Sequence, residues 1–195
     1  RNVALGISGS GGGNSVGGTL ALNMFLTDKK AIIGSSETTD NNISINAAQA
    51  VNIGVDTKQE IINGIISASV STSSNAISGA LSSNVVKGDS YALANRGADI
   101  NDNASLASSA TSQSVSVTVQ DNTTITDLTG TLAASSSNSV GIALGANVFW
   151  KDVKAGINSR VVADNNIDIS ADTSQNLTSF VVGIAGSTGG MTGAG

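Results

Sequence analysis

The chain has 195 residues and a formal net charge of −5, and it contains no proline, cysteine or histidine. Charged residues make up 12% and aromatic residues 3% of the sequence, both low for a globular domain. Without cysteine there are no disulfides or thiolate metal sites, and without histidine the commonest general base is missing. A weakly acidic chain without a long apolar run predicts neither a nucleic-acid partner nor a transmembrane segment.

The two ends of the sequence and its even composition suggest a repetitive segment of a longer protein. The sequence begins at Arg1 and ends in a glycine-rich stretch, Gly189–Gly195, so we expect it to be part of a longer protein. Valine and isoleucine are frequent and alternate with polar residues, which argues against disorder.

Three segments of the chain align without gaps. They start at Asn14, Asn75 and Asn138, so the repeat is about 61 residues long. A fourth copy starts at Gly183, where GIAGSTGG resembles GISGSGGG from Gly6. We therefore expect one continuous domain over 1–195, with repeats at about 4–65, 66–128 and 129–182 and the start of a fourth at 183–195.

Apolar residues inside the repeats recur with a period of two, which predicts β-strands. In the first repeat Val16, Gly18, Leu20, Leu22 and Met24 share one side, and we expect this side to be buried. Further alternating segments lie, in chain order, at 43–47, 51–55, 77–85, 115–119, 140–148 and 167–171.

Asparagine and aspartate clusters between these segments predict turns at 40–42, 102–103, 121–122 and 164–166. Glycine runs such as Gly11–Gly13 predict tight corners. Many short strands in a repeat favour an all-β parallel β-helix with about three coils of about 20 residues in each repeat of ~61 residues. About ten such coils would form a rod of roughly 45–50 Å.

Three segments resemble known classes of surface proteins. VADNNIDISA (Val162–Ala171) and NISINA (Asn42–Ala47) are similar to the coils of autotransporter and filamentous-haemagglutinin-type passengers, and NSVGIALGANVFWKDVKAGI resembles units of leukotoxin-like and adhesin-like bacterial surface proteins. The resemblance implies a right-handed β-helix, export across the outer membrane, and a role in adhesion or toxicity. NSVGIALG (Asn138–Gly145) also resembles head repeats of trimeric autotransporter adhesins, which recur after far fewer residues.

Equivalent positions of the three repeats carry identical side chains. The invariant columns are Asn14, Asn75 and Asn138; Asn23, Asn84 and Asn147; and Asp28, Asp89 and Asp152. They could form a ladder of ligand-binding groups along one face, or satisfy backbone groups at coil corners. With three coils per repeat the members of a column would lie roughly 14 Å apart, which favours the structural role.

Chemistry-bearing motifs are sparse, and we predict no catalytic residue, metal site or cofactor. Bound calcium stays open because aspartate and asparagine oxygens gather in turns. Asp168 and Asp172 have an even spacing and could share an outer face, as a polysaccharide-active enzyme would need. Trp150, the only tryptophan, with Lys151 and Lys154 forms a candidate contact for a glycan or protein partner.

The sequence therefore predicts a non-catalytic, secreted segment of a bacterial surface protein that acts as a rigid stalk, an adhesive module, or both. Its expected partners are a host-cell surface protein or glycan and the outer-membrane translocator of the parent protein. Its expected location is the cell surface or the extracellular space. A polysaccharide-active β-helix enzyme and a trimeric head-like adhesin are the alternatives.

Overall fold

The computed structural model describes residues 1–35, 43–102 and 113–195, and this part of the chain contains strands and no helix. The strands are, in chain order, β1 (Asn2–Ser10), β2 (Ser15–Leu26), β3 (Lys29–Ile33), β4 (Ile43–Ile45), β5 (Ala50–Ser71), β6 (Ala76–Ala94), β7 (Ala98–Ile100), β8 (Ser114–Ser135), β9 (Ser139–Ile157), β10 (Arg160–Val161), β11 (Ile167–Ser187) and β12 (Thr192–Ala194). The longest of them, β5 and β8, have 22 residues and extend over roughly 70 Å.

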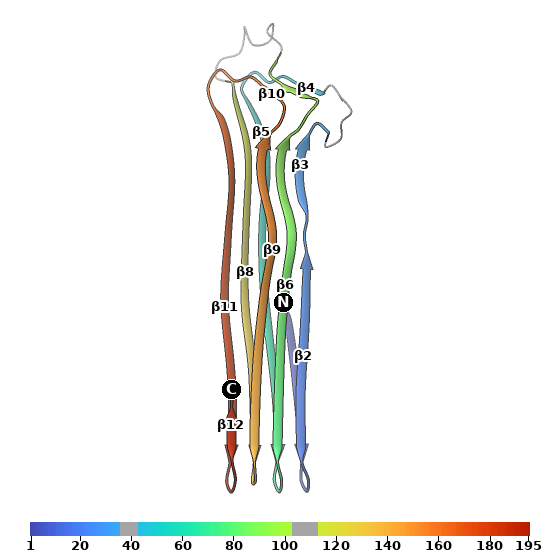
Figure 1. The fold of residues 1–195 in the computed structure, drawn as a ribbon, viewed down its shortest axis with the longest axis vertical. Helices are drawn as coiled ribbons and strands as arrows, with labels where there is room; N and C mark the ends of the chain where they lie inside the picture. Colours follow the sequence, from blue (N-terminus) through green and yellow to red (C-terminus); the bar gives the residue numbers. More distant parts are fainter. Residues whose placement is uncertain (36–42, 103–112) are drawn as a thin grey trace.

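All strand pairs are parallel and belong to three sheets. The first sheet has the order β1-β5-β8-β11, and the second has the order β12-β9-β6-β2 with β3 also paired to β6. A short third sheet has the order β10-β7-β4. Figure 1 shows the long strands side by side, joined by sharp turns at the bottom of the view. The predicted all-β class with parallel pairing is confirmed.

The pairing register shows that the chain makes one circuit per repeat. Asn2 pairs with Asn63 in the first sheet, and Ala76 pairs with Ser139 in the second. In both cases the partner lies one full repeat further along the chain. The prediction of three short coils per repeat, and of about ten coils in all, is therefore wrong. Each repeat instead contributes one long strand to each of the two large sheets.

The turn signals explain this error. Asp121 and Asn122 lie within β8 and not at a corner. The Asp121 side chain points inward, where it binds Ser90 and Lys151. The predicted turn at 164–166 is present between β10 and β11, and Gly11–Gly13 form the corner between β1 and β2. The predicted turns at 40–42 and around Asn103 fall outside the described residues.

The sharp turns lie at residues 11–14, 72–75, 136–138 and 188–191. We call the half of the two long sheets that adjoins them the turn half, residues 1–26, 62–87, 126–150 and 178–195. The rest of the described chain is the core half.

In the core half the usual polarity holds. Val51, Ile53, Val115, Val117 and Val119 face inward and form the main apolar cluster. The neighbouring sheet and the short third sheet complete this cluster with Ala92, Ala94 and Ile100. The period-two pattern at 51–55 and 115–119 therefore correctly predicts a buried face.

In the turn half the polarity is reversed. Val16, Leu20, Leu22 and Met24 share one face as predicted, but this face is the outer one, and Leu22 and Met24 are 69% and 70% exposed. The inner face carries mainly serine, threonine, asparagine and alanine, such as Ser78, Ser82 and Asn84 on β6. The expectation that the large apolar residues of these strands are buried is wrong.

The narrow space between the two sheets explains the reversal. A Cβ atom built on the inward-facing Gly17 would lie 2.8 Å from the carbonyl oxygen of Ala68 on the opposite sheet, and one on Gly141 would lie 2.7 Å from that of Ile184. Serine hydroxyls meet across the gap, with 3.0 Å between the oxygens of Ser78 and Ser67. Such a gap leaves room for a large side chain at few inward positions, Ile65 among them, so most large apolar side chains face outward.

Two glycines of β6 provide a matched test of this packing. A Cβ on the inward-facing Gly88 would overlap the carbonyl oxygen of Thr27, whereas one on the outward-facing Gly79 meets nothing within 4 Å. We expect Gly88→Ala to lower the free energy of unfolding by about 1–3 kcal/mol because the backbone must move. Gly79→Ala should leave it unchanged or raise it slightly.

Chemical denaturation followed by circular dichroism measures both variants. Equal effects of the two substitutions would contradict the register of β2 and β3 against β6.

Candidate functional site

The column of Asn23, Asn84 and Asn147 forms a hydrogen-bonded ladder between the sheets. Asn23 donates from Nδ2 to Oδ1 of Asn84 over 2.8 Å, and Asn84 donates to Asn147 over 2.7 Å. Asn2 extends the ladder at one end by donating to Asn23, and Asn147 donates to Asp127 at the other. Since Asn84 is fully buried, this column stabilises the stack and is not a surface for ligands.

The column of Asn14, Asn75 and Asn138 lies at the sharp turns. Asn75 donates from Nδ2 to Oδ1 of Asn14 over 3.1 Å, and Asn138 donates to Asn75 over 2.9 Å. Each acceptor oxygen also receives the backbone N–H of the asparagine in the next circuit. This matches the predicted structural role, but the column members are adjacent in the stack and not separated by three coils.

The aspartate column, Asp28, Asp89 and Asp152, lies on the outer face of the second sheet, next to basic and aromatic residues. One position further along the same face, Lys30, Tyr91 and Lys154 form a column of their own. The Tyr91 ring lies between two ammonium groups, 5.2 Å from that of Lys30 and 5.0 Å from that of Lys154.

Trp150 borders this group on the other side. Its side chain is 69% exposed, and the Lys87 ammonium lies 5.4 Å from the centre of its ring. We call the outward residues Lys87, Tyr91, Trp150, Asp152 and Lys154 the aromatic border. Sequence reasoning missed Tyr91 and Lys87, although the offset between the second and third repeats places them beside Lys154 and Trp150.

Hydrogen bonds within the aromatic border shift three pKa values. Tyr91 donates to Oδ2 of Asp152 over 2.7 Å, and this bond, with the nearby negative charge, raises the pKa of the phenol. Lys154 also donates to Asp152, which lowers the pKa of that carboxyl and raises the pKa of the ammonium. The three side chains act as one exposed polar cluster.

Lys151, predicted to contact a partner together with Trp150, points the other way. Its side chain is 1% exposed and its ammonium lies 2.8 Å from Oδ1 of Asp121, which is equally buried. It also donates to Oε1 of Gln59 over 2.6 Å, and Ser90 donates to Asp121 over 2.7 Å. Neighbouring residues of a strand face opposite sides, so Lys151 must be removed from the candidate contact while Trp150 and Lys154 stay.

Phe149 and Val148 show the same alternation. Phe149 packs against the buried cluster of Ile61, Val86 and Ile125, whereas Val148 is on the outer face.

The carboxylates considered for polysaccharide chemistry do not form a pair. Asp168 and Asp172 both lie on the outer face of β11, four residues apart, which is about 13 Å along a strand. Glycosidase carboxylates lie roughly 5–9.5 Å apart. Asp172 instead accepts a hydrogen bond from Ser170.

Within residues 1–35, 43–102 and 113–195, no group of three or more acidic residues is arranged to hold a metal ion. Nor does any helix there have the length and apolar character needed to span a bilayer.

Comparisons with known proteins gave no relative. No family model, no curated protein and no solved structure matches the chain.

The buried ion pair gives a prediction with a matched control. We expect Lys151→Met to lower the free energy of unfolding by about 3–5 kcal/mol, because it leaves Asp121 buried without its cation. Lys154→Met breaks an ion pair at the surface and should change stability little. Denaturant titrations of both variants measure the difference; similar values for the two would contradict the inward position of Lys151.

Tyr91 is the only tyrosine, so its ionisation can be followed by the ultraviolet absorbance of the phenolate. We expect it to titrate above the ordinary pKa of tyrosine. Asp152→Ala should lower this pKa, since it removes both the hydrogen bond and the negative charge that favour the protonated phenol. Asp28→Ala, in the same column but outside this cluster, should leave it unchanged, and an equal shift in both variants would contradict the assignment.

Proposed function

We propose that the chain is a rigid, non-catalytic segment of a secreted bacterial surface protein, built as a right-handed parallel β-helix. It serves as a stalk and, through the aromatic border, as an adhesive module. The observation that carries the proposal is the residue-by-residue pairing of successive repeats over strands of up to 22 residues. In such a stack each additional repeat lengthens the structure without changing its cross-section.

Stiffness follows from the number of bonds that cross between circuits. β5 and β6 are hydrogen-bonded along their whole length to β8 and β9 of the next repeat, and asparagine ladders add side-chain bonds in the same direction. This network supports a mechanical role outside the cell, where a protein without disulfides depends on packing and backbone ladders.

The adhesive part rests on the aromatic border. A largely exposed tryptophan beside lysine, tyrosine and aspartate side chains offers both an apolar ring face and hydrogen-bonding groups. Such combinations recognise glycans and protein surfaces. We propose a host-cell surface protein or glycan as the partner, and an outer-membrane translocator as the route of export.

The adhesive role predicts saturable binding of the folded chain to host cells, to a glycan panel or to matrix proteins. Trp150→Ala should weaken this binding by about tenfold or more, because an aromatic side chain that becomes buried on binding contributes much of the affinity of a contact. Lys154→Ala should weaken it less. Lys58→Ala, an exposed lysine on the other large sheet, is the matched control and should have no effect.

A denatured sample must not bind. If the folded chain binds nothing in the panel, the adhesive part is overturned and the stalk part stands alone. The stalk part is overturned if a chain with residues 76–138 duplicated fails to fold with one more strand in each large sheet.

A further inference from the structure

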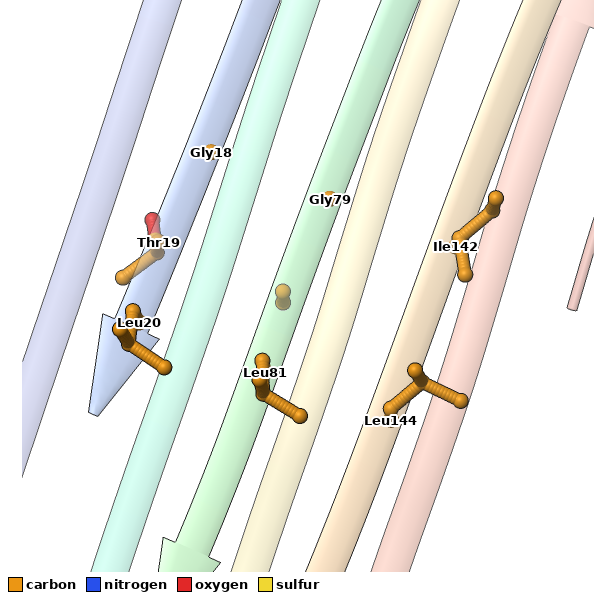
Figure 2. Close-up of a pocket in the computed structure, with 8 residues that line it drawn as sticks. Gly18, Thr19, Leu20, Gly79, Leu81, Ile142 and Leu144 are labelled. Carbon is orange, nitrogen blue, oxygen red and sulfur yellow. The ribbon is translucent and has the colours of Figure 1, made fainter. Parts of the chain in front are cut away.

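The outer surface of the turn half is apolar on both large sheets. On the second sheet the exposed side chains in the middle of this surface are Leu20, Leu81 and Leu144, which lie side by side on three neighbouring strands (Figure 2). They line a shallow depression above Gly18 and Gly79. On the first sheet the corresponding surface carries Val3, Leu5, Ile7, Ile66, Val70, Leu128, Leu132, Phe180, Val182 and Ile184. This is far more apolar surface than a water-soluble monomer usually leaves uncovered.

The apolar surface has a defined height. On β2 the outward apolar residues run from Val16 to Leu26, about 33 Å along a strand, and on β9 they run from Val140 to Val148, about 26 Å. On β5 the outward apolar residues run from Ile62 to Val70, at the same distance from the turns. The hydrocarbon core of a bilayer is about 30 Å thick, and strands that cross it carry an apolar band of about 25 Å.

Both ends of the band are polar. Towards the core half it ends on the second sheet at the aromatic border, where Trp150 and Tyr91 are accompanied by lysines. On the first sheet it ends at Lys58 and Glu60 of β5. Tryptophan, tyrosine and lysine are the residues that membrane proteins place at the level of the lipid headgroups. At the other end lie the short turns, made largely of glycine, serine, threonine and asparagine.

The inward positions of the turn half carry mainly serine, threonine, asparagine, glycine and alanine; the apolar exceptions are Ile65 and, next to the core half, Val86, Phe25 and Phe149. Ser69 donates to Ser15, Asn63 donates to Ser82, and Ser82 donates to Asp127. The sequence alternates apolar-out and polar-in, the reverse of the core half. A search for continuous apolar runs cannot detect this pattern, because every second residue is polar.

We propose that the turn half inserts into a phospholipid bilayer, with the outer faces of both large sheets against the acyl chains and the aromatic border at the headgroups. The core half, which has a polar outer face, stays in water. A single band at one height on both sheets fits a flat apolar layer. A protein partner would need only one face and would not require the charged and aromatic residues to gather at one edge.

Unpaired strand edges are costly in lipid, so insertion also requires partners for the edge strands. Gly6 of β1 and Gly183 of β11 belong to the same column of the stack, through Ser67 and Thr131. The edge formed by β1 in one copy can therefore pair in register with the edge formed by β11 in another. We infer that inserted copies associate head to tail.

The single tryptophan makes insertion measurable. When the folded chain is mixed with phosphatidylcholine vesicles, we expect Trp150 emission to shift to shorter wavelength. Lipids brominated near the headgroup should quench it more than lipids brominated near the chain ends. Chemical cross-linking in the vesicles should give a ladder of multimers.

Two leucines of β6 supply the matched variants. Leu81→Asp places a charge in the middle of the band and should weaken vesicle binding by about tenfold or more. Leu93→Asp makes the same change on the same outer face of the same strand, but in the core half, and should have little effect. Circular dichroism is the control that both variants are folded.

The proposal is overturned if vesicles leave the emission unchanged, or if the two leucine variants bind vesicles equally well. It is also overturned if sedimentation without lipid shows an oligomer that Leu81→Asp dissociates, because the band is then covered by a second copy. The adhesive function fails separately, through Trp150→Ala on the glycan and protein panel. Loss of vesicle binding in Leu81→Asp with panel binding retained would separate the two surfaces.

Discussion

Residues one repeat apart pair in register, and this places equivalent side chains about 4.8 Å from each other along the stack. Every position of the sequence must therefore tolerate a copy of itself, or of its counterpart, directly above and below. Asparagine meets this constraint well, since its amide can donate upward and accept downward at once. The ladder through Asn23, Asn84 and Asn147 shows this arrangement with bonds of 2.7 and 2.8 Å.

The same constraint limits how close the two large sheets can come and what lies between them. In the turn half they approach until a Cβ on Gly17 would touch the opposite backbone, so most inward side chains are small or hydrogen-bonded, and Ile65 is an exception. In the core half the third sheet, β10-β7-β4, lies beside the two others and the interior holds valine and isoleucine. Figure 1 shows that β5, β6, β8, β9 and β11 continue from one half into the other, whereas β2 and β3 are separate strands. One pair of sheets thus encloses a mainly polar interior near the sharp turns and an apolar cluster at the other end, with the buried Asp121–Lys151 pair between them.

Much of this fold could be predicted from the sequence, because the repeat offset and the period-two alternation are direct signatures of parallel strands. The circuit length could not, since asparagine and aspartate occur inside strands as well as at corners. Asp121 carries a turn signal, yet its environment is a buried ion pair that only the pairing with Lys151 reveals. Alternation also leaves the two faces of a strand equivalent until something shows which one is inside.

The candidate site was half predictable for the same reason. Trp150 and Lys154 lie outward as expected, but Lys151 between them must face inward by the alternation of the strand. The assumption that large apolar side chains are buried predicts the wrong face of the strand for Leu20 and its equivalents. That assumption requires water as the solvent and an interior wide enough for large side chains. The interior of the turn half is narrow, so the second condition is not met there.

Charged residues show how far the in-register constraint reaches. Inside the stack a repeated charge would lie directly against its own copies, and the inward positions avoid this. Asp121 is flanked by Thr57 and Thr173 in the neighbouring circuits. Asp127 is flanked by Asn63 and Ser179, and Lys151 lies beside Gly88.

On the outer face, in contrast, identical charged residues do repeat in register. Asp28, Asp89 and Asp152 repeat in register, each in water and beside a column of lysine and tyrosine that supplies hydrogen bonds and positive charge. Like charges stacked at strand spacing are tolerated there because solvent screens them and the neighbouring column offsets them. The contrast explains why the repeats are identical at the exposed aspartate column yet differ at the buried charges. Inside the stack, a charged residue occurs in only one circuit at a given position.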